Sequence, residues 1–95
     1  RIQVIVGDAN NTKDLQKVID LTDGDFDIIV DDCSHYTKQQ IESAAFFIPY
    51  MKDDGIYCIE DVRSQKKILD NLSQYNCKAY NFKPDTDDNL VVITK

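Results

Sequence analysis

The stretch Phe26-Asp-Ile-Ile-Val-Asp-Asp-Cys-Ser-His35 decides the fold that this sequence predicts. It opens as a strand apolar enough to be buried on both faces, and it ends in two aspartates and the only histidine of the chain. A second stretch, Asp54-Gly-Ile-Tyr-Cys-Ile-Glu-Asp61, repeats the plan of an apolar strand followed by two acids. A helical pattern separates the two stretches, so together they indicate a unit of two parallel strands joined by a helix.

The rest of the chain alternates strands and helices in the same way. Strands are predicted over residues 2–6, 26–30, 56–59, 77–82 and 90–94. The order βαβαβαββ predicts an α/β fold with a mostly parallel sheet and a C-terminal antiparallel hairpin. The turns are predicted at 22–25, 52–55 and 83–89.

The three helices are predicted from apolar residues at helical spacing and from residues that can cap a helix. Asn10 to Thr12 can cap the first helix, Thr37 and Gln40 form a capping box for the second, and Ser64 can cap the third. The apolar positions are Leu15, Val18 and Ile19 in the first helix, Ile41, Ala44, Ala45 and Ile48 in the second, and Ile68, Leu69, Leu72 and Tyr75 in the third.

The composition is that of one small globular domain: 95 residues, 42% hydrophobic and 29% charged. Seventeen acidic against 11 basic residues give a net charge of −6, which argues against binding to nucleic acid or to an anionic membrane surface. No apolar run is long enough to span a bilayer. Three widely spaced cysteines without a CxxC pair suit a reducing compartment, so a cytoplasmic location is expected.

Acidic residues follow three of the predicted strands: Asp8 after the first, Asp31 and Asp32 after the second, Glu60 and Asp61 after the third. Consecutive parallel strands place their carboxyl ends side by side, so the acids after the second and third strands should put up to four carboxylates at one edge of the sheet. Clustered carboxylates repel unless a cation neutralises them, and oxygen ligands suit Mg²⁺ or Ca²⁺. The alternative is that the acids only solvate loops or cap helices.

His35 stands three residues after Asp32, just before a predicted helix, where it could reach anything that the carboxylates bind. A histidine suits a general base near neutral pH, and we expect that role in preference to a structural one.

Cys33 could act as a nucleophile, but nothing in the sequence marks a residue that would orient it, so we interpret it as a small turn residue.

These two acidic motifs, with the helix between them, resemble the core of class I S-adenosylmethionine-dependent O-methyltransferases. They are most similar to the metal-dependent sugar O-methyltransferases of the macrocin and mycinamicin type and to their cephalosporin-hydroxylase-like relatives, whose pattern is D-D-G-S-H, a helix, then G-G-x-x-x-x-E-D. The resemblance implies methyl transfer from S-adenosylmethionine to a sugar or other vicinal-diol hydroxyl.

The resemblance also implies roles for residues of this chain. Asp32, Glu60 and Asp61 correspond to Mg²⁺ ligands and His35 to the base. Gly7-Asp8-Ala9 resembles the turn that binds the adenine ring, so Asp8 and Ala9 are expected to bind the cofactor, and Asp31 is assigned to the cofactor with them. The expected partner is a small sugar or diol substrate, with no nucleic acid and no membrane, while a homo-oligomer stays open.

The chain departs from the family pattern in two ways. Cys33 stands where the family usually has glycine, and the first two strands with their E-x-G-x-x-G loop are absent. We therefore expect residues 1–95 to be a fragment, the C-terminal portion of one methyltransferase-like domain with a partial Rossmann-like fold, that binds the cofactor poorly alone. The family sheet has the order 3-2-1-4-5-7-6, so strand 2–6 is expected to move beside strand 26–30 or to pair with another chain.

Two other functions stay open. One is a half-domain without catalysis that binds a metal or a partner. The other is a receiver-like signalling module, because Val30-Asp31-Asp32 and the late Thr94-Lys95 echo that fold. The receiver hypothesis lacks a phosphoacceptor aspartate at the end of a later strand, where residues 72–77 contain none.

Overall fold

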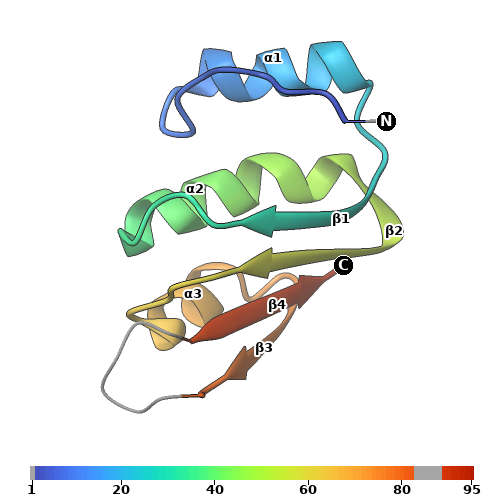
Figure 1. Ribbon diagram of the computed structural model, residues 1–95. Coiled ribbons are helices and arrows are strands. Elements are labelled where there is room, and N and C mark those ends of the chain that lie inside the picture. Colours follow the sequence, from blue (N-terminus) through green and yellow to red (C-terminus); the bar gives the residue numbers. More distant parts are fainter. Residues whose placement is uncertain (1, 83–88) are drawn as a thin grey trace.

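The computed structural model describes residues 2–82 and 89–95. Its elements, in chain order, are α1 (Thr12–Thr22), β1 (Phe26–Asp31), α2 (Thr37–Phe47), the 3₁₀ turn η1 (Ile48–Tyr50), β2 (Met51–Ile59), α3 (Gln65–Asn71), β3 (Asn76–Tyr80) and β4 (Leu90–Thr94). The described strands form one four-stranded sheet with the order β1-β2-β4-β3. The fold is therefore α/β, as predicted (Figure 1).

The pairing in this sheet is mixed. β1 and β2 are parallel, whereas β4 runs antiparallel to both β2 and β3. The antiparallel C-terminal hairpin is confirmed, and the strand order is compatible with the last four positions of the order 3-2-1-4-5-7-6. The prediction of a mostly parallel sheet is wrong, because the segment that would have added a parallel strand does not join the sheet. The predicted turn at 83–89 lies, except for Asn89, outside the described residues.

Residues 2–6 are extended but form no strand with the described part of the chain. Figure 1 shows this segment running beside α1, away from the strands. Its alternating apolar residues Ile2, Val4 and Val6 are 92%, 82% and 84% exposed. A strand needs a neighbour for its backbone and cover for one face, and this segment has neither here. The expected move beside β1 is wrong, and pairing with another chain stays a prediction.

β2 begins earlier than predicted, because the residues expected to form a turn belong to the strand. Gly55 makes this possible: a Cβ at this position would lie 3.1 Å from the backbone oxygen of Phe26 and 3.0 Å from that of Lys52. The ladder between β1 and β2 shifts its register between Phe26 and Ile28, opposite this close approach. A glycine inside a strand is typical of such an irregularity.

The helix starts follow the predictions in part. The side chain of Asn11 accepts a hydrogen bond from the backbone N–H of Lys13, so the predicted cap of α1 is confirmed. Ser64 does occupy the N-cap position of α3, but its side chain forms no capping hydrogen bond. The prediction of a capping box for α2 is wrong. Tyr36 is the N-cap residue and forms no side-chain capping hydrogen bond, while the side chain of Gln40 is buried in the protein.

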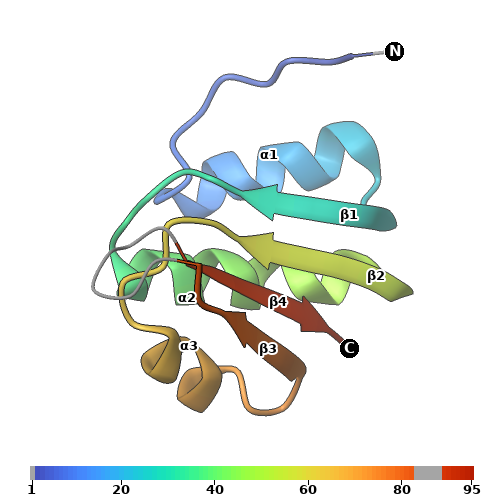
Figure 2. The same cartoon turned by 60° about the horizontal axis from the view of Figure 1, so that its bottom comes forward.

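The core lies between one face of the sheet and the two helices α2 and α3. Figure 2 shows α2 behind β2 and β4. The core residues of the sheet are Tyr57, Ile59, Val91 and Ile93, and those of the helices and the 3₁₀ turn are Ala44, Ile48, Ile68 and Leu72. The predicted inward positions of the second helix are confirmed for Ala44 and Ile48, whereas Ala45 is exposed.

The opposite face of the sheet is open among the described residues. Ile28 is 65% exposed, Val30 57% and Ile56 39%, and the register places Ile28 beside Ile56. The prediction that strand 26–30 is buried on both faces is therefore wrong for this chain, because α2 and α3 both pack on the other side. No helix in the described ranges is long and apolar enough to cross a membrane.

An isoleucine-to-threonine substitution should destabilise the protein far less on the open face of the sheet than on the buried face. Ile28→Thr on the open face should change the free energy of unfolding by less than about 0.5 kcal/mol. Ile59→Thr on the neighbouring strand, where the side chain is fully buried, should cost more than about 2 kcal/mol. Urea unfolding followed by circular dichroism measures both. Equal costs would show that the open face is covered in solution.

Candidate functional site

The carboxyl ends of β1 and β2 meet at one edge of the sheet. Asp31 lies in register with Ile59, and the backbone N–H of Glu60 donates to the carbonyl of Asp31 at 2.9 Å. Two loops leave this edge together: the β1 loop (residues 32–36) and the β2 loop (residues 60–64). The two acidic doublets are thus brought side by side, as the parallel strands predict.

The side chains of Asp32 and Glu60 face each other across these loops. The Asp32 carboxylate raises the pKa of Glu60 above its usual range, with smaller contributions from partial burial, from a hydrogen bond between the two carboxyls and from Asp61. The pair can therefore hold a shared proton or a cation more readily than either carboxyl alone.

Asp61 takes a different partner. Its Oδ2 lies 3.5 Å from Nε2 of His35, and the two side chains are 33% and 47% exposed. The backbone of Asp61 adopts a φ of +56°, a left-handed conformation that non-glycine residues adopt at a cost of about 1 kcal/mol. A carboxylate beside a histidine stabilises the charged imidazolium and orients the ring.

The three predicted metal ligands do not converge in this arrangement. Asp32 and Glu60 form one pair, while Asp61 pairs with His35. No group of three or more His, Cys, Asp or Glu side chains within residues 2–82 and 89–95 is placed to hold a metal ion. The oxygen donors are of the type that Mg²⁺ prefers, but the predicted triad is not assembled, so the magnesium site stays a prediction.

Asp31 is buried beneath the loops rather than presented to them. Its carboxylate accepts hydrogen bonds from the backbone N–H of Cys33 at 3.2 Å and from the Tyr57 hydroxyl at 3.4 Å. Burial raises the pKa of Asp31 although both hydrogen bonds oppose the shift, and burial beside Asp31 raises the pKa of Tyr57 in turn. Asp31 thus braces the start of the β1 loop, and its role in cofactor binding stays a prediction.

A surface pocket of about 740 Å³ brings the predicted base together with the predicted adenine turn. His35 lines it with Asp8 and Ala9, and Arg63 closes one side, where its guanidinium lies 6.0 Å from the ring of Tyr36. The three predicted metal ligands and Asp31 do not line this pocket. The structure therefore brings residues 8 and 9 into one pocket with His35 and not with the paired carboxylates.

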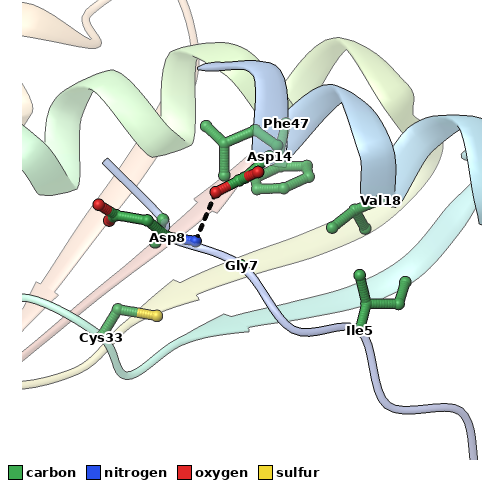
Figure 3. Close-up of a pocket in the computed structure, with 9 residues that line it drawn as sticks. Ile5, Gly7, Asp8, Asp14, Val18, Cys33 and Phe47 are labelled. Carbon is green, nitrogen blue, oxygen red and sulfur yellow. Dashed lines mark hydrogen bonds between the residues drawn. The ribbon is translucent and has the colours of Figure 1, made fainter. Parts of the chain in front are cut away.

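A smaller, mostly apolar pocket of about 240 Å³ lies between the N-terminal segment, α1 and the start of the β1 loop (Figure 3). Along it the backbone N–H of Asp8 donates to Oδ2 of Asp14 at 2.8 Å, which ties the turn at residues 7–9 to α1. Cys33 lines both pockets. Burial, together with Asp31 and Asp32, raises the pKa of its thiol, so Cys33 is a poor nucleophile and its reading as a turn residue gains support.

Gln40 is the site residue that the sequence analysis missed. Its side chain is fully buried, and its amide donates to the backbone carbonyls of Ser34, Glu60 and Asp61. The signal was present in the sequence, because Gln40 precedes Ala44 by four residues and so shares the inward face of α2.

Comparison with known proteins relates the chain to an O-methyltransferase. It is 37% identical over 62 residues to mycinamicin VI 2''-O-methyltransferase from Micromonospora griseorubida. The matched segment is 65% of this chain, but the chain spans only 15% of the length of that relative. No known family profile matches the chain, and no solved structure is significantly similar to it. This match supports a relationship to O-methyltransferases, as expected from the sequence motifs, but not to one particular group of them.

The buried carboxyl of Asp31 predicts a pH dependence of stability. Because its pKa is raised in the folded state, the folded protein binds this proton more tightly than the unfolded chain. Its contribution is fully present below the ordinary value of 3.8 and is lost as the pH rises through the folded pKa. Asp31→Asn keeps an acceptor for Cys33, so it should gain stability relative to wild type as the pH rises from 3 to about 7.

Thermal unfolding of both proteins over that pH range measures the difference. Asp20→Asn is the matched control, since Asp20 is exposed on α1 and lines neither pocket. A constant difference between Asp31→Asn and wild type at every pH would contradict the raised pKa.

Proposed function

We propose that this chain serves the transfer of a methyl group from S-adenosylmethionine to a hydroxyl of a sugar or other vicinal diol. The observation that carries the proposal is the single pocket in which His35, paired with Asp61, shares walls with Asp8 and Ala9. A base and a cofactor turn in one pocket are what a methyl transfer to oxygen needs, because the acceptor must lose its proton next to the methyl donor.

We propose further that residues 1–95 act as the C-terminal portion of a single methyltransferase-like domain. Two observations support this. Within residues 2–82 and 89–95 the sheet is covered on one face, with Ile28 and Val30 exposed on the other, and the chain spans 15% of the related methyltransferase. The family order places two further strands between strand 2–6 and strand 26–30. In this proposal those parts complete the cofactor site.

The proposed reaction assigns roles to His35, Asp61 and the turn at Asp8 and Ala9. His35 takes the proton of the acceptor hydroxyl, and Asp61 stabilises the imidazolium that forms. Bound S-adenosylmethionine would supply the methyl group to the deprotonated oxygen and would leave as the neutral thioether. Asp8 and the backbone of Ala9 hold the adenine end of the cofactor, and the orientation of both reactants supplies much of the rate.

The proposal includes Mg²⁺ held by Asp32, Glu60 and Asp61. The repulsion between the adjacent carboxyls of Asp32 and Glu60 supports a cation at this point. Asp61 would have to leave His35 to complete the set, so Asp32 and Glu60 carry this part of the proposal. A bound Mg²⁺ would neutralise the carboxylates and lower the pKa of a substrate hydroxyl.

Removal of the base is the direct test of the proposed reaction. In the natural protein that carries this chain, His35→Ala should lower the turnover of labelled methyl from S-adenosylmethionine to methyl glycosides by about 10²–10⁴-fold. Lys38→Ala is the matched control, because Lys38 is exposed in the first turn of α2, where it pairs with Glu42 and does not line the pocket of His35. The control should transfer at the wild-type rate.

Unchanged turnover in His35→Ala would remove this residue from the reaction. If the wild-type protein transfers no methyl group and does not bind S-adenosylmethionine, the proposed function is wrong, and a half-domain that binds a metal or a partner without catalysis becomes the better account.

The metal part of the proposal has its own test. Chelation should abolish turnover, Mg²⁺ should restore it, and Glu60→Gln should raise the Mg²⁺ concentration needed for half-maximal rate by about tenfold or more. Glu42→Gln, an isosteric change at an exposed position of α2, is the control and should leave that concentration unchanged. Turnover that resists chelation would contradict a metal at the Asp32–Glu60 pair.

A further inference from the structure

Gln40 joins the two acidic loops through a single side chain. It lies in the first turn of α2, is fully buried, and its Nε2 lies 2.8 Å from the carbonyl oxygen of Ser34 in the β1 loop. The same nitrogen lies 3.2 Å from the carbonyl of Glu60 and 3.3 Å from that of Asp61 in the β2 loop. The amide has two hydrogens, so at least two of the three carbonyls share one.

The orientation of this amide is determined by its surroundings. Rotation by 180° would place Oε1 against three carbonyl oxygens and remove the donor that Nε2 gives each of them. In the observed orientation Oε1 is buried with no hydrogen-bond partner among the described residues. A buried acceptor without a partner is unfavourable, so the three donated hydrogen bonds must outweigh it for the side chain to stay here.

The carbonyls that Gln40 holds belong to the residues that carry the candidate chemistry. Ser34 directly precedes His35, while Glu60 and Asp61 provide the paired carboxyl and the partner of His35. Asp61 also has the positive φ, a conformation that persists only where neighbouring groups hold the backbone in place.

We propose that Gln40 is a positioning residue that sets the spacing of the β1 and β2 loops, and with it the contacts of His35 with Asp61 and of Asp32 with Glu60. Its effect on catalysis rests on the proposed function, whereas the positioning itself does not. Gln40 touches neither substrate nor cofactor in this proposal, and it acts only through the backbone of the two loops.

The chain offers a matched control for the loss of such a side chain. Gln65 also bridges two backbone carbonyls, those of Tyr80 at 3.0 Å and Leu90 at 2.9 Å, but it does so at the hairpin. Gln40→Met and Gln65→Met both replace an amide by an unbranched apolar side chain of similar length. Each loses donated hydrogen bonds, and only the first loses them at the acidic loops.

Amide hydrogen exchange, read residue by residue with NMR, separates positioning from general stability. In Gln40→Met the backbone amides of Cys33 and Glu60, which are hydrogen-bonded to Asp31, should exchange about tenfold faster or more relative to the core amide of Tyr57. In Gln65→Met this ratio should stay as in wild type. An unchanged ratio in Gln40→Met would overturn the proposal.

The wild-type protein provides a second readout if Gln40→Met does not fold. The two side-chain amide protons of Gln40 should exchange slowly and show nuclear Overhauser effects to Ser34 and Asp61, whereas those of Gln74, which is exposed after α3, should exchange freely. Fast exchange at Gln40 would overturn the proposal.

A kinetic readout links the positioning to the reaction. If the protein transfers methyl groups, Gln40→Met should lower kcat about tenfold or more with a smaller change in KM, and Gln65→Met should leave kcat unchanged. A wild-type kcat in Gln40→Met would overturn the catalytic effect. If no methyl transfer occurs at all, the proposed function fails, while the exchange measurements still decide the positioning.

Discussion

The parallel pairing of β1 with β2 is the constraint on which the rest of the site depends. It places Asp31 beside Ile59 and is extended past the end of the strands by the hydrogen bond from Glu60 to the Asp31 carbonyl. An acidic loop therefore follows each of the two strands at the same edge of the sheet. The helix between the strands contributes Gln40, which connects the backbones of both loops. Strand register, helix face and loop spacing are thus one connected arrangement.

Local patterns predicted most of this arrangement. The strand cores, the three helices and the C-terminal hairpin follow from apolar spacing and β-branched runs, because those signals are contained within a few residues. The behaviour of residues 2–6 does not. Their alternation is that of a strand, but a strand forms only where another provides an edge, and the local pattern carries no information about that neighbour. The same limit explains why Ile28 is exposed despite an apolar run typical of a buried strand.

The candidate site could also be predicted from the sequence only in part. The acidic doublets and His35 were found because their position after the strands predicts a common edge. The side-chain partners of these residues were not predicted. The sequence analysis grouped Asp32, Glu60 and Asp61 as one set of metal ligands, whereas the structure pairs Asp32 with Glu60 and Asp61 with His35. Side-chain pairing depends on backbone conformation, here the positive φ of Asp61, which no spacing rule predicts.

The central claim is that the pocket shared by His35, Asp8 and Ala9 receives S-adenosylmethionine. Titration of the ¹⁵N-labelled protein with S-adenosylmethionine, followed by NMR, tests it directly and detects weak binding. We predict chemical-shift changes in the amides of residues 8–10 and of the β1 loop that saturate together, with the amides of β3 unchanged. Shift changes confined to other parts of the chain, or none at millimolar ligand, would contradict the account.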